Sequence, residues 1–442
     1  MTVSPAGRRP TPDAVLSRGS AWLNRILLLV TKPQHAALIF GLAILLVYCA
    51  VPLVLSLSGY PDPAYRTLAA MVAVGVLVMW ATYGVGKIAT LSVPTINVDQ
   101  NLFLIIVIGI FVAFAVLSWA TAEQIPLVAA LQGADPDTVA ALRESFLKAR
   151  SGWQSSFVYV NAILSGALLP YCIALLFIRD SRYKWWVFAF FMFYSISFVE
   201  KAFFLKAVIP LFYLLCQGIF RSRLQPSMIA AGSVLLLFAF VALSRVGAGW
   251  NVGGGDFWAP TYQPSTALDQ LAWRTFAVPM FSAVDSIKLW ETSFHYPLGG
   301  ATSSIVSSLV GLDRIEFERL VFAFEWGQNE AGTGSTNAVY VIEAFVNFGW
   351  AGVCAFSAVV GLMFRMFADS EDEAFRALWL IFAFNLFAAG LIGLVFSNGF
   401  LFIFLIAIFT RMGRVRAPGA ARAPVHTVRS SARMVMPWER RV

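Results

Sequence analysis

Charged residues are scarce in this chain of 442 residues. Asp, Glu, Lys and Arg make up 13% of it, whereas hydrophobic residues make up 59%. A soluble domain is about a quarter charged and about half apolar, and its core has no room for this much apolar surface. The composition therefore excludes an ordinary soluble domain and indicates a chain that lies largely in a lipid bilayer.

Histidine and cysteine are also few, with three and four residues. All four cysteines fall in apolar runs, where a thiol behaves as a small apolar side chain, so we expect no disulfide. The sequence has no CxxC pair, no histidine cluster and no P-loop, so we expect neither a bound metal nor a cofactor. The cysteines are Cys49, Cys172, Cys216 and Cys354.

Long apolar runs are abundant. A membrane-spanning helix needs about 20 mostly apolar residues, and ten runs approach this length. We therefore predict an all-α polytopic membrane protein with about ten transmembrane helices. A further apolar segment, 337–349, is too short to span and is expected to be re-entrant or interfacial. The ten runs are 36–58, 67–86, 101–121, 157–178, 184–200, 202–220, 227–245, 350–367, 376–396 and 398–412.

Lysine and arginine are distributed unevenly between the two sides of the predicted membrane domain. With both termini inside, eight such residues fall in short inner loops and three in short outer loops. The positive-inside rule then favours cytoplasmic termini in a bacterial inner membrane. The same distribution indicates that the net charge of +8 serves to orient the protein in the membrane and does not indicate nucleic-acid binding. The inner set is Lys87, Arg179, Arg182, Lys184, Arg221, Arg223, Arg365 and Arg376, and the outer set is Arg66, Lys201 and Lys206.

The pattern divides the chain into three parts. Residues 1–35 form an N-terminal tail, in which Trp22 and Ile26 belong to a predicted interfacial amphipathic helix. Residues 36–412 form the transmembrane domain, which carries two large helical outer loops. Residues 413–442 form a basic tail rich in Arg, Ala and Pro, which we expect to be disordered and close to anionic lipid.

The first large outer loop, 122–156, contains a predicted helix over 135–150. Pro136 suits the first turn of this helix. Arg143 and Arg150 lie on one side of it, and a guanidinium fork matches the oxygens of a diphosphate. A solvated cover helix, whose arginines touch lipid head groups, is an equally weighted alternative.

The second large outer loop, 246–336, is too aromatic for a disordered linker. Helical patterning covers 267–277, 280–291 and 314–325. The loop also carries arginines that suit the binding of an anion. The loop and the segment after it carry residues that suit the role of a general base. A lone histidine beside aromatic residues is more often structural. The arginines are Arg274, Arg314 and Arg319, with Arg245 at the entrance, and the candidate bases are Glu325, Glu343 and His295.

Two more features lie close to this loop. Residues 329–337 are rich in turn-forming residues, and a helix that starts near Thr336 directs its first amides at an anion. Lys206 falls inside an apolar run close to Glu200 and Lys201, where a charge is costly and marks a candidate site. A solvated turn between two spans is the simpler account of this charge.

Four stretches of the chain resemble the Wzy-type oligosaccharide repeat-unit polymerases of the O-antigen and exopolysaccharide pathways. They follow one another across 142–360, and the last contains Asn347, Gly349 and Gly352, which are similar to the late NFG segment of that family. The stretches are LRESFLKARSG from Leu142, FFLKAVIPLFYLL from Phe203, WRTFAVPMFSAVDSI from Trp273 with Tyr296–Gly299, and GTGSTNAVYVIEAFVNFGWAGV from Gly332.

The resemblance implies a fold of the C-type glycosyltransferase and O-antigen ligase-polymerase group. It implies metal-independent transfer of a growing glycan from undecaprenyl diphosphate to the next lipid-linked unit at the periplasmic face. It also implies a chain-length regulator and a flippase of the same pathway as partners. We expect outer-loop guanidiniums to meet over one cavity that opens to lipid and to hold the diphosphate. They are Arg143, Arg150, Arg274 and Arg319, with Arg314 and Arg245 as alternates.

Other functions remain open at this point. An O-antigen ligase uses the same donor and is expected to depend on an outer histidine. A C-type glycosyltransferase with a monophosphate donor is expected to carry an acidic motif in the short outer loop between the first two spans, where only Asp62 stands, between two prolines. A polysaccharide transporter or flippase is expected to show matching halves and broken helices, and no matching halves are found. A non-catalytic chain-length factor is expected to tolerate loss of the outer arginines.

Overall fold

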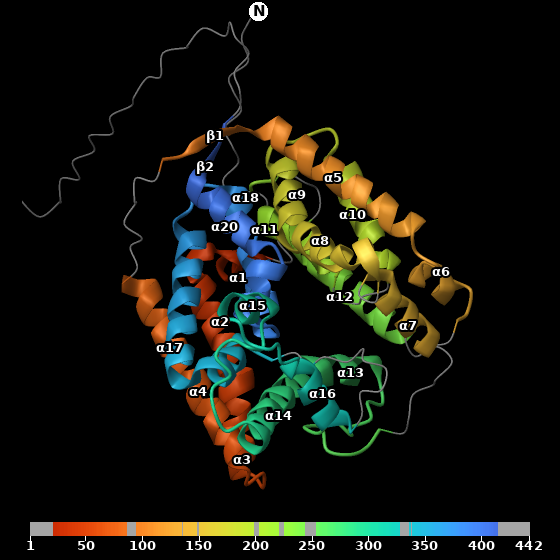
Figure 1. The fold of residues 1–442 in the computed structure, drawn as a ribbon. Helices are drawn as coiled ribbons and strands as arrows, with labels where there is room; N and C mark the ends of the chain where they lie inside the picture. Colours follow the sequence, from red (N-terminus) through yellow and green to blue (C-terminus); the bar gives the residue numbers. More distant parts are fainter. Residues whose placement is uncertain are drawn as a thin grey trace, which may run out of the picture.

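The computed structural model describes residues 21–85, 94–134, 136–147, 150–198, 203–220, 225–243, 253–327, 336 and 338–413. Within these ranges the chain is helical apart from one small parallel sheet. Strand β1 (Ile96–Asp99) pairs with β2 (Thr410–Gly413), with Ile96 opposite Thr410. The sheet holds the start of α5 (Gln100–Ala120) beside the end of α20 (Phe400–Phe409), at the top of the molecule in Figure 1.

Five helices in the described part are long and apolar enough to cross a membrane. The prediction of an all-α membrane protein is confirmed at this level, and the described helices support five of the ten predicted spans. The other predicted runs give shorter elements, α10 (Lys184–Ser197), α11 (Leu205–Cys216), α12 (Pro226–Leu243), α18 (Glu373–Arg376), α19 (Trp379–Phe387) and α20 (Phe400–Phe409). The five candidate spans are Pro33–Leu57, α4 (Pro63–Val85), α5 (Gln100–Ala120), Gly152–Ile178 and α17 (Tyr340–Asp369).

Prolines shape two of the candidate spans. The span Pro33–Leu57 contains η2 (Pro33–His35), α2 (Ala36–Leu45), a π-helical turn η3 (Leu46–Ala50) and α3 (Val51–Leu57). The span Gly152–Ile178 contains η4 (Gly152–Ser156), α8 (Phe157–Ile163), a π-helical turn η5 (Leu164–Leu168) and α9 (Leu169–Ile178). Pro52 and Pro170 are each the second residue after a π turn. A proline ring clashes with the preceding turn and lacks an N–H, and the wider π turn accommodates both effects.

The last two predicted spans form a hairpin of two short helices. Helices α19 and α20 have 9 and 10 residues, a rise of about 14–15 Å, whereas the hydrocarbon core is about 30 Å thick. The start of α19 is held at the end of α1, since Trp379 Nε1 donates to Thr31 O at 2.9 Å. Helix α20 leads into β2 at the same side. The segment between them, with π turn η7 (Gly393–Ser397), therefore reaches only into the middle of the molecule.

The segment 337–349 is not a separate re-entrant element in the described residues. Helix α17 runs from Tyr340 to Asp369 with a single break at Gly349, where φ is 63° and ψ is −154°. Only glycine adopts this combination readily. The short apolar segment is thus the first part of a candidate span, bent at the glycine of the NFG sequence.

The core of the membrane domain is aromatic, and three of its buried tyrosine hydroxyls have partners. Helix α17 packs along α4, and the buried Tyr340 hydroxyl lies 3.1 Å from Ser357 Oγ. Tyr48 donates to Phe387 O at 2.6 Å, and Tyr171 donates to the Asp372 carboxylate at 2.6 Å. These bonds tie helices from distant parts of the chain together, because an unpaired hydroxyl in an apolar core is costly.

Both large outer loops are helical, as expected. The first contains α6 (Pro126–Leu131) and α7 (Pro136–Leu147). The second contains α13 (Ala267–Ala272), η6 (Trp273–Ala277), α14 (Val278–Ser293), α15 (Ser304–Val310) and α16 (Phe317–Trp326). In Figure 1, α7, α13, α14 and α16 lie at the end of the molecule away from β1 and β2.

The two tails are described only in part. Helix α1 (Ala21–Thr31) occupies the predicted interfacial segment and packs against α11 and α12. Gln217 Nε2 donates to Thr31 Oγ1 at 2.9 Å, which fixes the end of α1 to α11. Residues 1–20 and the tail from 414 onwards, for which we predict disorder, lie outside the described residues.

Candidate functional site

A polar cavity of about 330 Å³ lies where the second outer loop meets the α19–α20 hairpin. Helix α16 and the segment before it supply two arginines, and the start of α17 supplies a carboxylate. The loop before α15 supplies three hydroxyls, and the hairpin supplies a glycine-rich backbone. The lining residues are Thr302, Ser303, Ser304, Arg314, Glu316, Phe317, Glu318, Arg319, Glu343, Ala389, Gly390, Gly393, Leu394, Ser397 and Asn398.

Asn347 fixes the hydroxyl-bearing wall of this cavity to α17. Its fully buried side chain donates from Nδ2 to Thr302 Oγ1 at 2.7 Å and to Glu343 O at 2.8 Å. Its Oδ1 accepts from the N–H groups of Gly300 at 3.1 Å and Thr302 at 3.4 Å. One amide thus satisfies both the helix and the loop, two residues before the break at Gly349. This explains why an asparagine is needed at this place.

Glu343 lies at the contact between α17 and the hairpin. Its Oε2 accepts from the N–H of Ile392 at 3.1 Å. The hairpin backbone comes so close that a Cβ at Gly390 would lie 2.6–2.8 Å from the atoms of this carboxyl group. Glycine at 390 therefore makes room for the carboxylate, which lies at the cavity wall.

Arg314 and Arg319 are the two predicted arginines that line this cavity. Both side chains are 51% exposed, and both pair with Glu316, at 3.6 Å and 2.8 Å. Exposed ion pairs contribute only about 0–1 kcal/mol each. A diphosphate, with more charge and more oxygens than one carboxylate, is therefore able to replace Glu316 as the partner of both guanidiniums.

Arg150 occupies a different cavity of about 170 Å³, beside the first outer loop. Its guanidinium donates from Nε to Phe146 O at 2.6 Å and from Nη2 to Ser118 O at 2.9 Å. It also bonds Thr121 and Gln154, and it lies over the rings of Phe146 and Phe157. These contacts link α5 to the first outer loop, so Arg150 serves the structure of that loop.

The other predicted arginines are not at the polar cavity. Arg143 is half-buried on α7, and Arg274 is exposed on η6, with its guanidinium over the Trp273 ring. Arg245 lies outside the described residues. The described part of the chain thus brings two of the six expected guanidiniums, Arg314 and Arg319, to one cavity. The expected meeting of arginines from both outer loops is not found there.

The remaining candidate bases differ in their surroundings. Glu325 lies on α16 against α14, where burial first and Asp285 second raise its pKa to about 8. A carboxyl group with this pKa is mostly protonated at pH 7, and such a group is an acid rather than a base. His295 is exposed, has a φ of 62°, and follows the end of α14 outside the polar cavity.

Two further charged positions also have structural contacts. The ammonium of Lys206 lies over the Phe203 ring at 4.2 Å, at the start of α11. Asp62, between α3 and α4, pairs with Lys288 of α14 at 3.3 Å and so ties the first hairpin to the second outer loop. Glu200 and Lys201 lie outside the described residues.

The sequence reasoning missed the contributions of Thr302, Ser303 and Gly390 to the site. The stretch Tyr296–Gly299 belongs to the resemblance, but nothing in a single sequence relates the loop after it to the amide of Asn347 or to a hairpin some 90 residues later. No known protein family, curated protein or solved structure matches this chain.

Proposed function

We propose that the protein is a membrane glycosyltransferase of the repeat-unit polymerase kind, acting on undecaprenyl-diphosphate-linked oligosaccharides. The observation that carries the proposal is the polar cavity, whose lining combines two arginines, three carboxylates and four hydroxyls beside membrane helices. Arginines match a diphosphate, and hydroxyls and carboxylates match the hydroxyl groups of a sugar. Arg314, Arg319 and Glu343 take over the roles that the resemblance assigns to a wider set of residues.

The proposed reaction exchanges one glycosidic bond for another. A hydroxyl oxygen of the acceptor unit attacks the anomeric carbon of the growing glycan. The bond from this carbon to the diphosphate oxygen breaks, and the diphosphate leaves with the bonding electron pair. Arg314 and Arg319 stabilise the charge that develops on it, and Glu343 receives the proton of the attacking hydroxyl. The bilayer holds both lipid-linked substrates in one plane, which leaves orientation as the main task of the protein.

The proposed orientation has the polar cavity on the periplasmic side of the inner membrane. Both termini then lie in the cytoplasm, in agreement with the positive-inside distribution of lysine and arginine. A flippase that supplies lipid-linked units and a regulator of chain length are the partners that such a polymerase needs.

The test is the double variant Arg314→Gln/Arg319→Gln as the sole copy in the host strain. Glutamine keeps much of the length and hydrogen bonding but removes the charge. We expect polymeric glycan to fall about a hundredfold or more, as for the loss of electrostatic stabilisation in other enzymes, while single lipid-linked units accumulate. Arg66→Gln, at an exposed arginine of α4, is the control and keeps normal polymer. Normal polymer from the double variant contradicts the proposal.

Two alternatives make different predictions in the same strain. A ligase that uses an outer histidine loses activity in His295→Ala, which the proposed site tolerates because His295 is outside the cavity. A transporter is favoured by the break at Gly349 and by the hairpin of short helices, since broken helices line many transport sites. Purified protein in vesicles separates the classes, because a transferase lengthens lipid-linked glycan and a transporter only moves it.

A further inference from the structure

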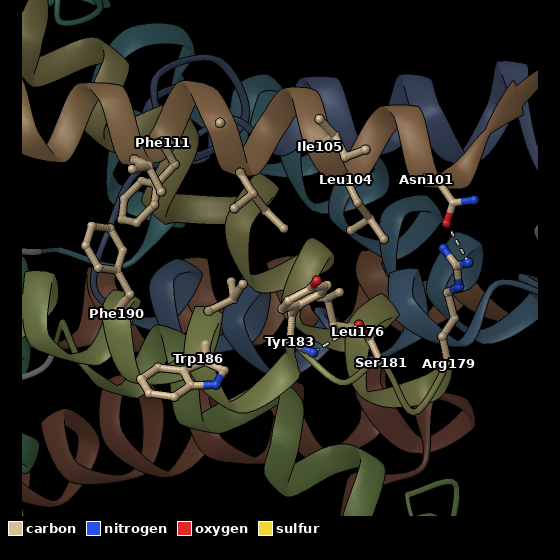
Figure 2. Close-up of a pocket in the computed structure, with 14 residues that line it drawn as sticks. Asn101, Leu104, Ile105, Phe111, Leu176, Arg179, Ser181, Tyr183, Trp186 and Phe190 are labelled. Atoms are coloured by element: carbon tan, nitrogen blue, oxygen red, sulfur yellow. Dashed lines mark hydrogen bonds between the residues drawn. The ribbon is translucent and has the colours of Figure 1, made fainter.

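A further cavity, a groove of about 840 Å³, lies between α5, the end of α9 and the start of α10. Its walls are almost entirely apolar along most of its length, and Phe111 and Phe190 stand at the far end (Figure 2). It shares no lining residue with the polar cavity. The proposed function leaves this groove unexplained.

The length of the groove matches one leaflet of a bilayer. Its lining on α5 runs from Asn101 to Val112, a rise of about 16 Å. The hydrocarbon core of a bilayer is about 30 Å thick, so the groove covers about half of it. Helix α5 is a candidate span and α9 is the second half of another. Helix α5 also exposes large apolar side chains such as Ile105 and Ile110.

One end of the groove is polar and cationic. Arg179 Nη2 donates to Asn101 Oδ1 at 2.7 Å across this end (Figure 2). Tyr183 and Trp186, which also line the groove, are 53% and 78% exposed. Exposed tyrosine and tryptophan mark the boundary between lipid tails and head groups. The polar end therefore lies at the level of the head groups.

The charges at this end favour an anion. The turn from α9 to α10 carries Arg179, Arg182 and Lys184, against one acid, Asp180, which pairs with Lys184. The guanidinium of Arg179 makes only the bond to Asn101 within the part of the chain that the structure describes. Its planar fork carries five N–H donors, which suit the oxygens of a phosphate.

From this geometry we infer that the groove binds one anionic glycerophospholipid of the bilayer. An acyl chain lies along α5, and the phosphate lies against Arg179 and the positive turn. A helix of a partner protein fits less well, because an apolar helix offers no anion to Arg179. The inference does not depend on the proposed function, since it concerns a separate cavity at the side of the termini.

Gly109 allows a direct test of the groove. It lines the groove on α5, and a Cβ added there meets nothing within 4 Å, so Gly109→Trp fills the groove without a backbone clash. Gly232→Trp, at an exposed glycine of α12 with equally open space, is the matched control. Arg179→Gln removes the head-group cation while it keeps an amide for Asn101.

The measurement is the melting temperature of the full-length protein in detergent, with added phosphatidylglycerol or phosphatidylcholine, together with native mass spectrometry. We expect wild type and Gly232→Trp to bind phosphatidylglycerol at least tenfold more tightly than phosphatidylcholine. Gly109→Trp should lose this binding at least tenfold, and Arg179→Gln should lose the preference between the two lipids. A wild type without preference, a polyprenyl phosphate as the retained lipid, or Gly109→Trp and Arg179→Gln variants that both behave as wild type overturn the inference.

Discussion

Glu343 and Gly390 are matched to each other at the scale of atoms. The carboxylate needs the space that a side chain at 390 would occupy, and it accepts the N–H of Ile392 only while it lies there. Because the carboxylate is the end of a flexible side chain, an alanine at 390 displaces it rather than unfolding the protein. A substitution at position 390 therefore tests the proposed role of Glu343 without a large loss of stability.

We predict that Gly390→Ala lowers polymerase activity at least tenfold, with less than about 2 kcal/mol of lost stability. The displaced carboxylate loses its backbone donor and its place in the cavity. Activity and melting temperature of the purified variant are the two measurements. Adding Glu343→Asp, which shortens the side chain by one methylene, should restore part of the activity. Gly84→Ala, on α4 in open space, is the control. Full activity in Gly390→Ala would remove Glu343 from the mechanism.

Glu325 gives the protein a pH-dependent stability. Its pKa of about 8 in the folded state lies above the ordinary value of 4.5, mainly because of burial against α14. Below pH 4.5 both folded and unfolded states are protonated, and the folded state has its full advantage. As the pH rises towards 8, the unfolded state releases the proton first, so stability falls across this window and stays low above it.

Glu325→Gln should remove this part of the pH dependence. A neutral amide needs no proton, so we predict that the variant is more stable than wild type at pH 8.5 by about 2 kcal/mol, after allowance for partial exposure. At pH 4.5 the two proteins should melt within a few degrees of each other. Melting curves in detergent between pH 4.5 and 9 measure the difference, with the exposed Glu291→Gln as control. Parallel curves for Glu325→Gln and wild type would refute the assignment.

At the scale of helices, the sequence predicts that a helix forms more reliably than it predicts how long the helix is. The apolar runs located every candidate span, because a bilayer imposes about 20 apolar residues on a simple helix. They failed for α19 and α20, where two short helices meet at Gly390 and Gly393 instead of crossing. Apolar composition is the same in a full span and in a hairpin that is covered by other helices, so only packing distinguishes them.

The candidate site was also predictable only in part, in its residue types but not in its full set of contacts. Arginine and carboxylate chemistry directed attention to Arg314, Arg319 and Glu343, which do meet at one cavity. The same chemistry also selected Arg150, whose donors bond neighbouring residues of the protein. Residue type gives the chemistry that is possible, whereas the fold decides which guanidiniums are already engaged. The contact between Asn347 and the loop at 300–302 depends on the break at Gly349, and a single sequence does not reveal that geometry.

At the scale of the whole molecule, the parallel sheet of β1 and β2 holds the start of α5 and the end of α20 together on one side. The polar cavity opens near the start of α17, and the sheet lies near its far end (Figure 1). The polar cavity and the sheet therefore lie at different levels along α17. In the proposed orientation the sheet faces the cytoplasm and the polar cavity faces the periplasm.

Single cysteines test this arrangement. In a variant without Cys49, Cys172, Cys216 and Cys354, we predict that Thr292→Cys, exposed at the end of α14, reacts with a membrane-impermeant maleimide in cells with a permeabilised outer membrane. Glu371→Cys, exposed after α17, should react only once the inner membrane is disrupted. The reverse pattern would put the cavity in the cytoplasm, where no periplasmic polymerisation is possible. The groove at Arg179 would keep its lipid in either case, because anionic phospholipid is present in both leaflets of the membrane used for reconstitution.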